Sequence, residues 1–256
     1  MVESLMVHSF KGGTGKSTIA ANLAISLAQR ELNVGVMDMD MAGPGIHVIF
    51  GIQEDDVRYT LNDVFLQRAK PAQTAIELTS RLGLNKGRLI FTPASTKVED
   101  MLAVLRSGLE LITFKSALDE LAEQFQLDFI LIDSHPGIEN DTLLSLGVCD
   151  VILVVSRIDQ QDISGTGVIM KLAATLEKKA VMILNQIPKS IGARDLEDIG
   201  RKVGDIFGTN VVATLPFYDD IHETLSKQIF TLSAPRHEFS SRINMVADVV
   251  TNSIRA

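Results

Sequence analysis

A glycine-rich segment near the amino terminus constrains this chain more than any other feature. Residues Lys11–Thr18 read Lys-Gly-Gly-Thr-Gly-Lys-Ser-Thr and join the apolar segment 5–10 to a segment with a helical pattern. This order predicts a strand, then a glycine-rich turn, then the beginning of a helix. Such an arrangement directs backbone N–H groups and the positive end of a helix dipole at one place, where phosphate oxygens can bind. Lys16 is placed to reach the outer phosphates of a nucleotide, and the Ser17 hydroxyl is placed to ligate Mg²⁺. The predicted phosphate loop consists of Lys11, Gly12, Gly13, Thr14, Gly15, Lys16, Ser17 and Thr18.

The loop departs from the common phosphate loop in two respects. Phe10 stands where that loop has its first glycine, and a second lysine, Lys11, opens the segment. The segment thereby resembles the deviant Walker A motif, Lys-Gly-Gly-x-Gly-Lys-Ser/Thr, of the MinD/ParA family of SIMIBI-class P-loop ATPases. The resemblance implies that the chain binds ATP and Mg²⁺ and that Lys11 and Lys16 take part in ATP hydrolysis. It also implies that Lys11 reaches phosphates of the nucleotide bound by a second copy of the chain.

Apolar runs alternate with helical patterns along the whole sequence. Such alternation is typical of βαβ units, and continuously apolar runs are typical of parallel strands buried on both faces. We expect strands at 4–9, 34–39, 88–92, 128–133, 151–156, 180–185 and 211–215. We expect helices at 16–30, 60–68, 110–125, 140–147, 161–177, 194–206 and 237–253. The sequence therefore predicts an α/β fold of the P-loop NTPase type. A mostly parallel central sheet would carry helices on both faces in three Rossmann-like layers, as a single domain over residues 1–256.

Two segments fit this alternation less well. In residues 53–86, Pro71 is placed to open a short helix after the one expected at 60–68. Residues 95–115 carry many apolar side chains and few charges. Packing in the core is the default interpretation of that segment, and a surface for a partner or a second copy is the alternative.

The overall charge limits the classes of partner. With 24 Lys and Arg residues against 32 Asp and Glu residues, the formal net charge is −8. So acidic a chain does not attract nucleic acid through its overall field, although a local patch still can. The segment 171–202 has a modest excess of cations, for which we expect a solvated helical face, with a nucleic-acid contact as the alternative. No apolar stretch approaches the roughly 20 residues that span a bilayer and no secretory signal is visible, so we expect a cytoplasmic protein.

A pair of aspartates ends the second expected strand. Asp38 and Asp40 stand two residues apart, so their side chains point to the same side of an extended chain. The carboxyl ends of parallel strands form the ligand edge of such a sheet, where carboxylates can hold Mg²⁺ waters or orient an attacking water. The family resemblance implies that Asp38 lies near Mg²⁺ and that Asp40 polarises the nucleophilic water.

The strand expected at 128–133 also ends in an aspartate. The segment Asp133–Gly137 reads Asp-Ser-His-Pro-Gly and fits a Walker B motif, so the resemblance implies that Asp133 holds a Mg²⁺-bound water. Gly137 would let the backbone approach the γ-phosphate. The resemblance implies no role for His135, and we expect a local structural histidine there.

Two later residues are candidates for contact with the base. Asn185 ends the strand expected at 180–185, and an Asn side chain carries both a donor and an acceptor, as the edge of adenine does. The family reads adenine with an Asn at this point. Pro216 matches the proline of the family's base loop, where backbone groups face adenine.

The segment Asp38–Pro44 also resembles the Mrp-type relatives, which carry iron–sulfur clusters. Those proteins hold the cluster through a pair of cysteines, whereas this chain has a single one, Cys149. Two thiolates in a dimer fall short of the usual four, so we expect no iron–sulfur cluster and a buried Cys149.

The last expected helix bears on membrane binding. MinD itself ends in a basic amphipathic helix that binds membranes, and such a helix needs a polar face rich in Lys and Arg. Here only Arg242 and Arg255 are nearby cations. We therefore expect the helix to pack on the sheet, and peripheral membrane association stays open. Its apolar face consists of Phe239, Ile243, Val246, Val250 and Ile254.

Together, the motifs and the family resemblance imply an ATPase that forms a homodimer with Mg-ATP and separates after slow hydrolysis. Among the relatives the chain looks most like the MinD-type ATPases, so we expect a switch for spatial positioning that acts with an unidentified protein partner or activator. The alternatives are DNA partition of the ParA type, metallocentre maturation of the Mrp type, and a regulatory nucleotide switch with negligible turnover.

Overall fold

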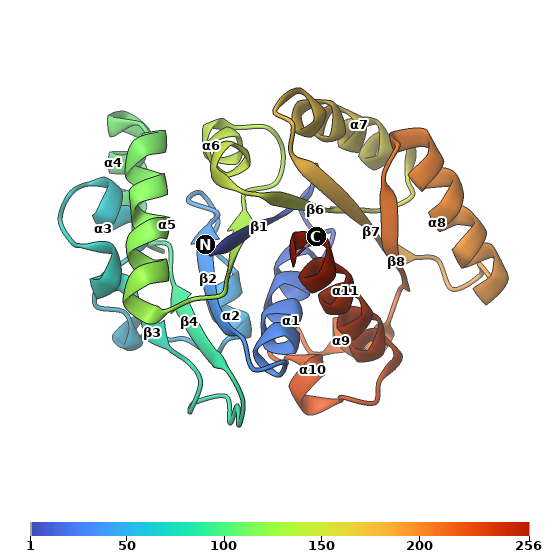
Figure 1. The fold of residues 1–256 in the computed structure, drawn as a ribbon, viewed down its shortest axis with the longest axis horizontal. Coiled ribbons are helices and arrows are strands. Elements are labelled where there is room, and N and C mark those ends of the chain that lie inside the picture. Colours follow the sequence, from blue (N-terminus) through green and yellow to red (C-terminus); the bar gives the residue numbers. More distant parts are fainter. Residues whose placement is uncertain (1, 256) are drawn as a thin grey trace.

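The computed structural model describes residues 2–255, with the side chains of Ala193 and of residues 253–255 excepted. An eight-stranded sheet forms its centre, in the order β3-β4-β2-β5-β1-β6-β7-β8 (Figure 1). Neighbouring strands run parallel except for β3, which pairs antiparallel with β4. The strands are β1 (Glu3–His8), β2 (Asn33–Met39), β3 (Ile76–Glu77), β4 (Arg88–Thr92), β5 (Phe129–Ser134), β6 (Val151–Ser156), β7 (Lys179–Ile187) and β8 (Asn210–Pro216).

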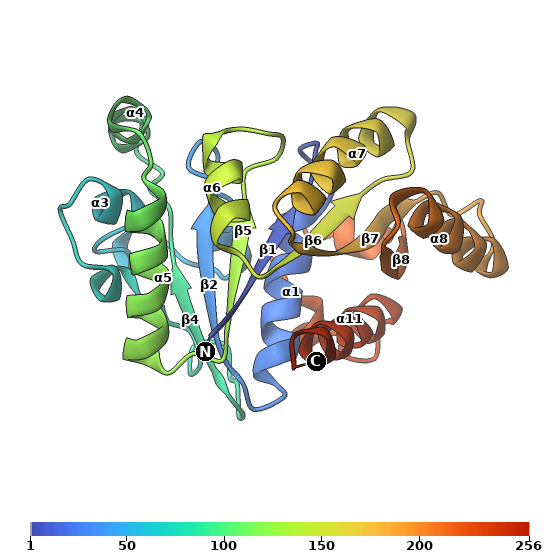
Figure 2. The ribbon, with the colours of Figure 1, turned by 45° about the horizontal axis from the view of Figure 1, so that its top comes forward.

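Helices cover both faces of this sheet (Figures 1 and 2). The helices α1 (Lys16–Ala28), α2 (Ile46–Ile49), α10 (Phe230–Ser233) and α11 (Glu238–Arg255) share the core on one face. On the other face lie α3 (Leu61–Phe65), α4 (Val98–Ser107), α5 (Leu111–Phe125), α6 (Asn140–Val148), α7 (Gln160–Thr175) and α8 (Ala193–Phe207). The short α9 (Asp219–Glu223) follows β8, and two 3-10 turns cover Glu54–Asp56 and Pro71–Thr74. The predicted α/β fold with a mostly parallel sheet between two helical layers is confirmed.

The central strands explain why the sequence shows unbroken apolar runs. Every residue of β5 and β6 is buried, because helices cover both of their faces. In β1, alternate side chains enter the two cores: Leu5 and Val7 face the α1 side, and Met6 faces the opposite side. Pairing in register brings Asp38 of β2 directly beside Asp133 of β5. The carboxyl ends of β1, β2 and β5 therefore meet at one edge of the sheet.

The predicted strands and helices are found within a few residues of their expected limits. The prediction omitted β3, α2, α9 and α10, which are too short to show a clear period, and it omitted the longer α4. Pro71 opens a 3-10 turn as expected.

The core interpretation of residues 95–115 is wrong for much of the segment. Val104 and Phe114 are buried, but Leu102, Leu105 and Ile112 are 45%, 73% and 83% exposed. The reason is visible in Figure 2, where α4 projects beyond the end of α5 instead of lying on the sheet. Apolar side chains are thus exposed near the carboxyl edge of the sheet, and a surface for a partner or a second copy stays a prediction.

The last helix packs on the protein, as predicted. Phe239, Ile243, Val246 and Val250 are all at most 2% exposed, and α11 contacts α1 and β8. Ile254 and Arg255, which also entered the argument about this helix, lie outside the described side chains. Over the described residues, no helix is both long and apolar enough to cross a membrane.

Removing a buried side chain of α11 tests this packing. Ile243→Ala should lower the free energy of unfolding by about 2–5 kcal/mol, because it leaves a cavity between α11 and the sheet. Met245→Ala on the same helix is the control, since Met245 is 60% exposed and its loss should cost less than about 0.5 kcal/mol. Urea unfolding followed by circular dichroism measures both. Equal, small effects would mean that α11 is not anchored on the sheet.

Candidate nucleotide-binding site

The predicted phosphate loop joins β1 to α1 at the carboxyl edge of the sheet. Gly13 and Gly15 have φ angles of +75° and +88°, a region that glycine enters without strain, and α1 begins at Lys16. The loop lines a cavity of about 270 Å³ together with Asp40 and Pro136. The backbone N–H groups at the start of α1 thus face a hollow of suitable size for phosphate groups.

Phe10 holds this loop against α7. A Cβ atom built on Gly165 of α7 would lie 1.9 Å from Cδ1 and 2.2 Å from Cγ of the Phe10 ring. The ring therefore occupies space that only a glycine leaves open. This contact explains how the loop accommodates a bulky side chain where the common loop has glycine.

A buried ion pair lies beneath the loop. Nζ of Lys16 is 2.5 Å from Oδ1 of Asp133, and both side chains are almost fully buried. Asp38 is fully buried beside Asp133, and this burial, followed by repulsion from Asp133, raises the pKa of Asp38 well above its ordinary value. Lys16 opposes this shift, so one lysine balances two neighbouring carboxyl groups.

These residues fit a hydrated Mg²⁺ ion. Oδ2 of Asp38 and Oδ2 of Asp133 are buried and have no hydrogen-bond partner among the described residues. Oxygen ligands are what Mg²⁺ takes, and it commonly keeps several waters while bound by one or two protein groups and substrate phosphates. The Ser17 hydroxyl lies at the same spot, with its Oγ 3.4 Å from Nζ of Lys16.

His8 is a buried residue of the site that the sequence analysis missed. Its Nδ1 lies 2.7 Å from Oγ of Ser134, and the same hydroxyl donates to the carbonyl of Val7 at 3.1 Å. Burial, and then the charge of Lys16, lower the pKa of His8 to about 3. His8 is therefore a neutral side chain that ties β1 to the end of β5. A histidine at the end of a strand carries no signal of this in the sequence.

The segments that follow β2 and β5 meet above the carboxylates. Oδ1 of Asp40 lies 2.7 Å from Nδ1 of His135, a contact that the sequence analysis did not predict. Gly137 has a φ angle of +91°, and its N–H donates to the carbonyl of Ser9 at 3.0 Å. The structure thus places Asp40 and Gly137 beside the phosphate loop, where the sequence analysis expected them.

Lys11 points away from its own phosphate loop. Its Nζ donates to Oδ1 of Asp159 and to Oε1 of Gln161, both at 2.9 Å, at the start of α7. The Lys11 side chain is 25% exposed. Within one chain, the structure does not bring Lys11 together with Lys16.

A second cavity adjoins the phosphate cavity. It has a volume of about 470 Å³ and shares Gly13, Gly15, Thr18 and Ser226 with the first cavity. Both predicted base residues, Asn185 and Pro216, line it. The sequence analysis missed several other lining residues, namely Gln186, Phe217, Tyr218, Ile221 and His222.

Asn185 is fixed in this second cavity by the phosphate loop. Its Nδ2 donates to the carbonyl of Thr14 at 2.7 Å, and the neighbouring Gln186 donates to the carbonyl of Gly13 at 3.0 Å. The amide group of Asn185 therefore uses one of its two N–H donors on the loop. Its carbonyl oxygen is the group left to accept a hydrogen bond from a base.

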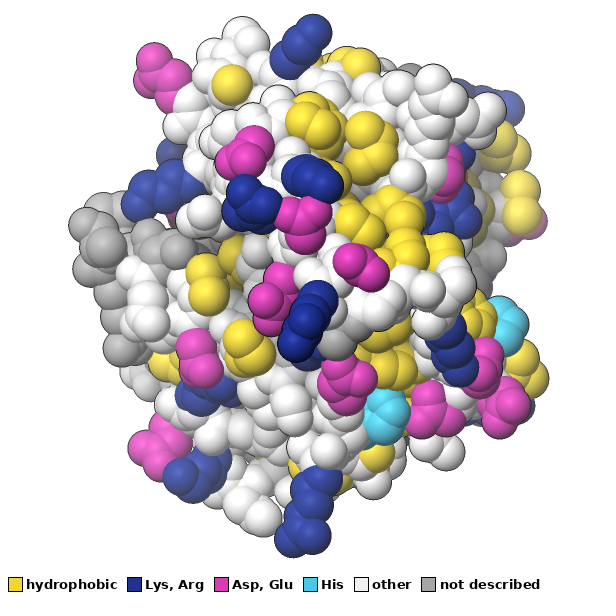
Figure 3. All heavy atoms as spheres, turned by 90° about the vertical axis from the view of Figure 1, so that its right-hand side faces the viewer, with side chains coloured by type: hydrophobic (Ala, Val, Ile, Leu, Met, Phe, Trp, Pro, Cys, Tyr) yellow, Lys and Arg dark blue, Asp and Glu magenta, His cyan; other side chains and the backbone are white. Residues whose placement is uncertain are grey.

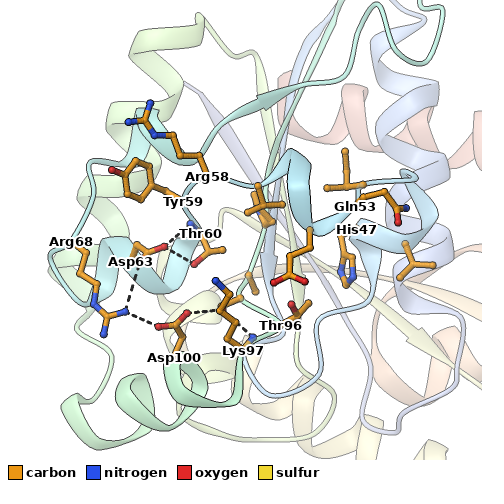
Figure 4. A pocket seen from close by; sticks show the side chains of 17 residues that line it. His47, Gln53, Arg58, Tyr59, Thr60, Asp63, Arg68, Thr96, Lys97 and Asp100 are labelled. Atoms are coloured by element: carbon orange, nitrogen blue, oxygen red, sulfur yellow. Dashed lines mark hydrogen bonds and ion pairs between the residues drawn. The ribbon is translucent and has the colours of Figure 1, made fainter.

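A larger cavity of about 600 Å³ lies between α2, α3 and the start of α4 (Figure 4). It holds none of the predicted site residues. Three of its charged side chains pair with one another: Arg68 lies 2.6 Å from Asp100 and 3.7 Å from Asp63. The two smaller cavities, and not this one, therefore form the candidate nucleotide site.

The cations of the segment 171–202 do not gather into a patch. Figure 3 shows the side of the molecule on which α8 and β8 lie in Figure 1, and its positive and negative side chains alternate. Arg201 and Lys202 both pair with Asp198. Lys178 donates to the carbonyls of Gly147 and Cys149. This face offers little of the clustered charge that phosphate contacts need.

The comparisons with known proteins agree with this geometry. A family model described as "ParA: NUBPL iron-transfer P-loop NTPase" matches residues 1–251. The flagellum site-determining protein YlxH of Helicobacter pylori is 25% identical over 259 residues, which cover 98% of this chain and 82% of that protein. The iron-sulfur cluster carrier protein of Pyrococcus furiosus is 26% identical over 208 residues, which cover 80% and 66%. The structure of septum site-determining protein MinD of Pyrococcus horikoshii, complexed with Mg-ADP, superposes with a TM-score of 0.80 at 19% identity, covering 98% of this chain and 96% of that one.

Neutralising Asp38 should stabilise the protein in buffer without Mg²⁺ or nucleotide. Asp38→Asn keeps the shape of the side chain and removes the repulsion from Asp133, so we expect a gain on the order of 1–3 kcal/mol at pH 7. Because folding raises the pKa of Asp38, the native protein binds this proton more tightly than the unfolded chain does. The gain should therefore shrink as the pH falls toward 3.8, the ordinary pKa of the group.

Urea unfolding at several pH values measures this gain. Asp55→Asn, which removes an exposed negative charge, is the matched control and should leave stability within about 0.5 kcal/mol. A loss of stability in Asp38→Asn would show that the carboxylate is not strained by its surroundings.

The contact between Phe10 and α7 gives a second prediction. Gly165→Ala would force the Phe10 ring to move, and with it the start of the phosphate loop, so ATP affinity should fall by about tenfold or more. Gly167→Ala on the same helix is the control, because its Cβ would meet Phe207 only at 3.4 Å. Isothermal titration with Mg-ATP measures both variants. Unchanged affinity in Gly165→Ala would mean that Phe10 does not hold the loop.

Proposed function

Since the chain belongs to the ParA family of P-loop NTPases, we propose that it is a Mg²⁺-dependent ATPase that acts as an ATP-dependent dimerisation switch for spatial positioning. The observation that carries this proposal is the position of Lys11. Its ammonium group lies at the carboxyl edge of the sheet, partly exposed and turned away from its own loop. A second copy facing that edge could receive this charge on the phosphates of its own nucleotide.

Binding of ATP would rearrange the buried ion pair. Lys16 would leave Asp133 for the outer phosphates, while the N–H groups at the start of α1 hold the remaining phosphate oxygens. The hydroxyl of Ser17 would hold Mg²⁺ directly, and the carboxyl groups of Asp38 and Asp133 would hold its waters. The metal supplies a positive charge that offsets the charge developing on the transferred phosphoryl group.

Hydrolysis would depend on Asp40, whose carboxylate lines the phosphate cavity. We assign to it the orientation of the water that attacks the γ-phosphate. Lys16 and the partner's Lys11 would stabilise the charge that spreads over the phosphoryl oxygens. Loss of the γ-phosphate would release the segments around Asp40 and Gly137, and the dimer would separate.

The base would enter the second cavity. The side-chain oxygen of Asn185 would accept a hydrogen bond from the amino group of adenine, while the bond from Nδ2 to Thr14 holds the amide in place. The backbone at Pro216 would face the other side of the base edge.

Metallocentre maturation is the second candidate function, because the matching family description names iron transfer and an iron-sulfur carrier is among the similar proteins. The single cysteine argues against a resident cluster. Cys149 is buried, as predicted, and burial raises the pKa of its thiol to about 12. Such a thiol is protonated and out of reach of a metal. DNA partition is disfavoured because two cations of α8, Arg201 and Lys202, pair with Asp198.

Light scattering after size-exclusion chromatography tests the switch. We expect the hydrolysis-impaired Asp40→Ala protein to be a dimer with Mg-ATP and a monomer with Mg-ADP. Adding Lys11→Ala should abolish the dimer while the monomer still binds ATP, because the ammonium group of Lys11 bonds to Asp159 and Gln161 at the start of α7.

Lys86→Ala in the same background is the matched control. Lys86 is an exposed lysine paired with Glu31, outside both cavities, and its loss should leave the dimer intact. A monomer in both nucleotide states, with ATP binding verified by calorimetry, would rule out the switch. Normal dimers in the Lys11→Ala protein would remove Lys11 from the interface.

A further inference from the structure

The contact between Asp40 and His135 joins two segments that lie 95 residues apart in the sequence. It arises because β2 and β5 are neighbours in register, with Asp38 beside Asp133. Asp40 and His135 each lie two residues beyond that pair, so they also come side by side. Their side chains are 14% and 21% exposed, which shields the contact from most of the solvent.

The hydrogen bonds of Asp40 are unevenly shared between its two carboxylate oxygens. Oδ1 accepts from the N–H of Gly43 at 2.9 Å and lies 2.7 Å from Nδ1 of His135. A carboxylate has no hydrogen to donate, so Nδ1 of His135 carries the hydrogen in this contact. Oδ2 makes no hydrogen bond that the structure shows within residues 2–255. One oxygen is therefore fixed by two donors, and the other is left for a ligand or water.

The backbone of His135 is restrained by its neighbours. The backbone carbonyl of His135 accepts a hydrogen bond from Oγ1 of the buried Thr142 at 3.4 Å. Pro136 follows directly and restricts the backbone of His135, and Gly137 is bonded to Ser9 beside the phosphate loop. These restraints hold the backbone of His135 in place, and from that backbone the ring reaches Oδ1 of Asp40.

We propose that His135 is a positioning residue for ATP hydrolysis: it donates from Nδ1 to Oδ1 of Asp40 and thereby presents Oδ2 of Asp40 to the attacking water. This inference rests on the proposed ATPase function and assigns the proton on Nδ1 a structural use, so no proton leaves His135 during the reaction. Orientation of a reacting group matters because a small displacement of a catalytic carboxylate can reduce the rate about a hundredfold.

The test is a set of substitutions at His135 in the full chain, with ATPase activity measured at saturating and at low Mg-ATP. His135→Ala should lower kcat by about ten- to a hundredfold, while KM and the affinity for Mg-ATP change less than about threefold. His135→Asn should restore much of kcat, because its amide N–H can occupy the place of Nδ1. His135→Gln should restore less, because its amide reaches past that place. A merely structural role would not distinguish Asn from Gln in this way.

A double-mutant cycle shows whether His135 acts through Asp40. Asp40→Ala combined with His135→Ala should be no slower than Asp40→Ala alone. Additive losses, an unchanged or raised kcat in His135→Ala, or equal activity of the Asn and Gln variants would each overturn the proposal. Thermal unfolding confirms that each variant is folded.

The outcomes also separate this inference from the function on which it rests. Turnover that depends on Asp40 but not on His135 would overturn the positioning role alone. Wild-type protein that binds ATP without hydrolysing it would overturn both.

Discussion

The buried charge cluster at the ends of β1, β2 and β5 is the constraint on which the rest of the site depends. Asp38 and Asp133 lie side by side because their strands are neighbours in register, and both are removed from water. Burial and mutual repulsion both disfavour two charged carboxylates, so a cation must lie close to them. Lys16 supplies that charge in this structure. A Mg-nucleotide would draw Lys16 to its phosphates and return positive charge to the carboxylates, which couples nucleotide binding to the stability of the sheet's centre.

The strand order also links the charge cluster to two segments at the surface. The segment after β2 holds Asp40, the segment after β5 holds His135 and Gly137, and the two segments contact each other and the phosphate loop. A phosphate group that moves one of them must therefore disturb the other. This is the arrangement that a switch needs, because a small change at the phosphates reaches two surface segments at once.

The surfaces outside the site bear on three possible binding partners: a membrane, a nucleic acid and another protein. The α11 helix uses its apolar face inside the protein, so that face is not available to a membrane. Two cations of α8, Arg201 and Lys202, pair with Asp198 on the same helix. In contrast, α4 and the start of α5 expose Leu102, Leu105 and Ile112 near the carboxyl edge of the sheet. Protein-binding surfaces expose apolar side chains of this kind where these form a contiguous patch.

The sequence by itself determined the fold class, the phosphate loop and the carboxylates at the strand ends. Those features are local: strands buried on both faces read as apolar runs, and the loop chemistry requires glycine, lysine and serine at fixed spacings. Only the tertiary structure decided which side chains meet. Strand order brings Asp40 to His135 and sets the position of His8. Helix placement sets Gly165 against Phe10, where it leaves space for the ring. The exposure of α4 depends on helix placement too, since an apolar segment looks the same in sequence whether it lies on the sheet or projects beyond its edge. The physical reason is that the periodicity of apolar residues shows which face of a single helix or strand is buried. Contacts between side chains depend instead on which helices and strands become neighbours.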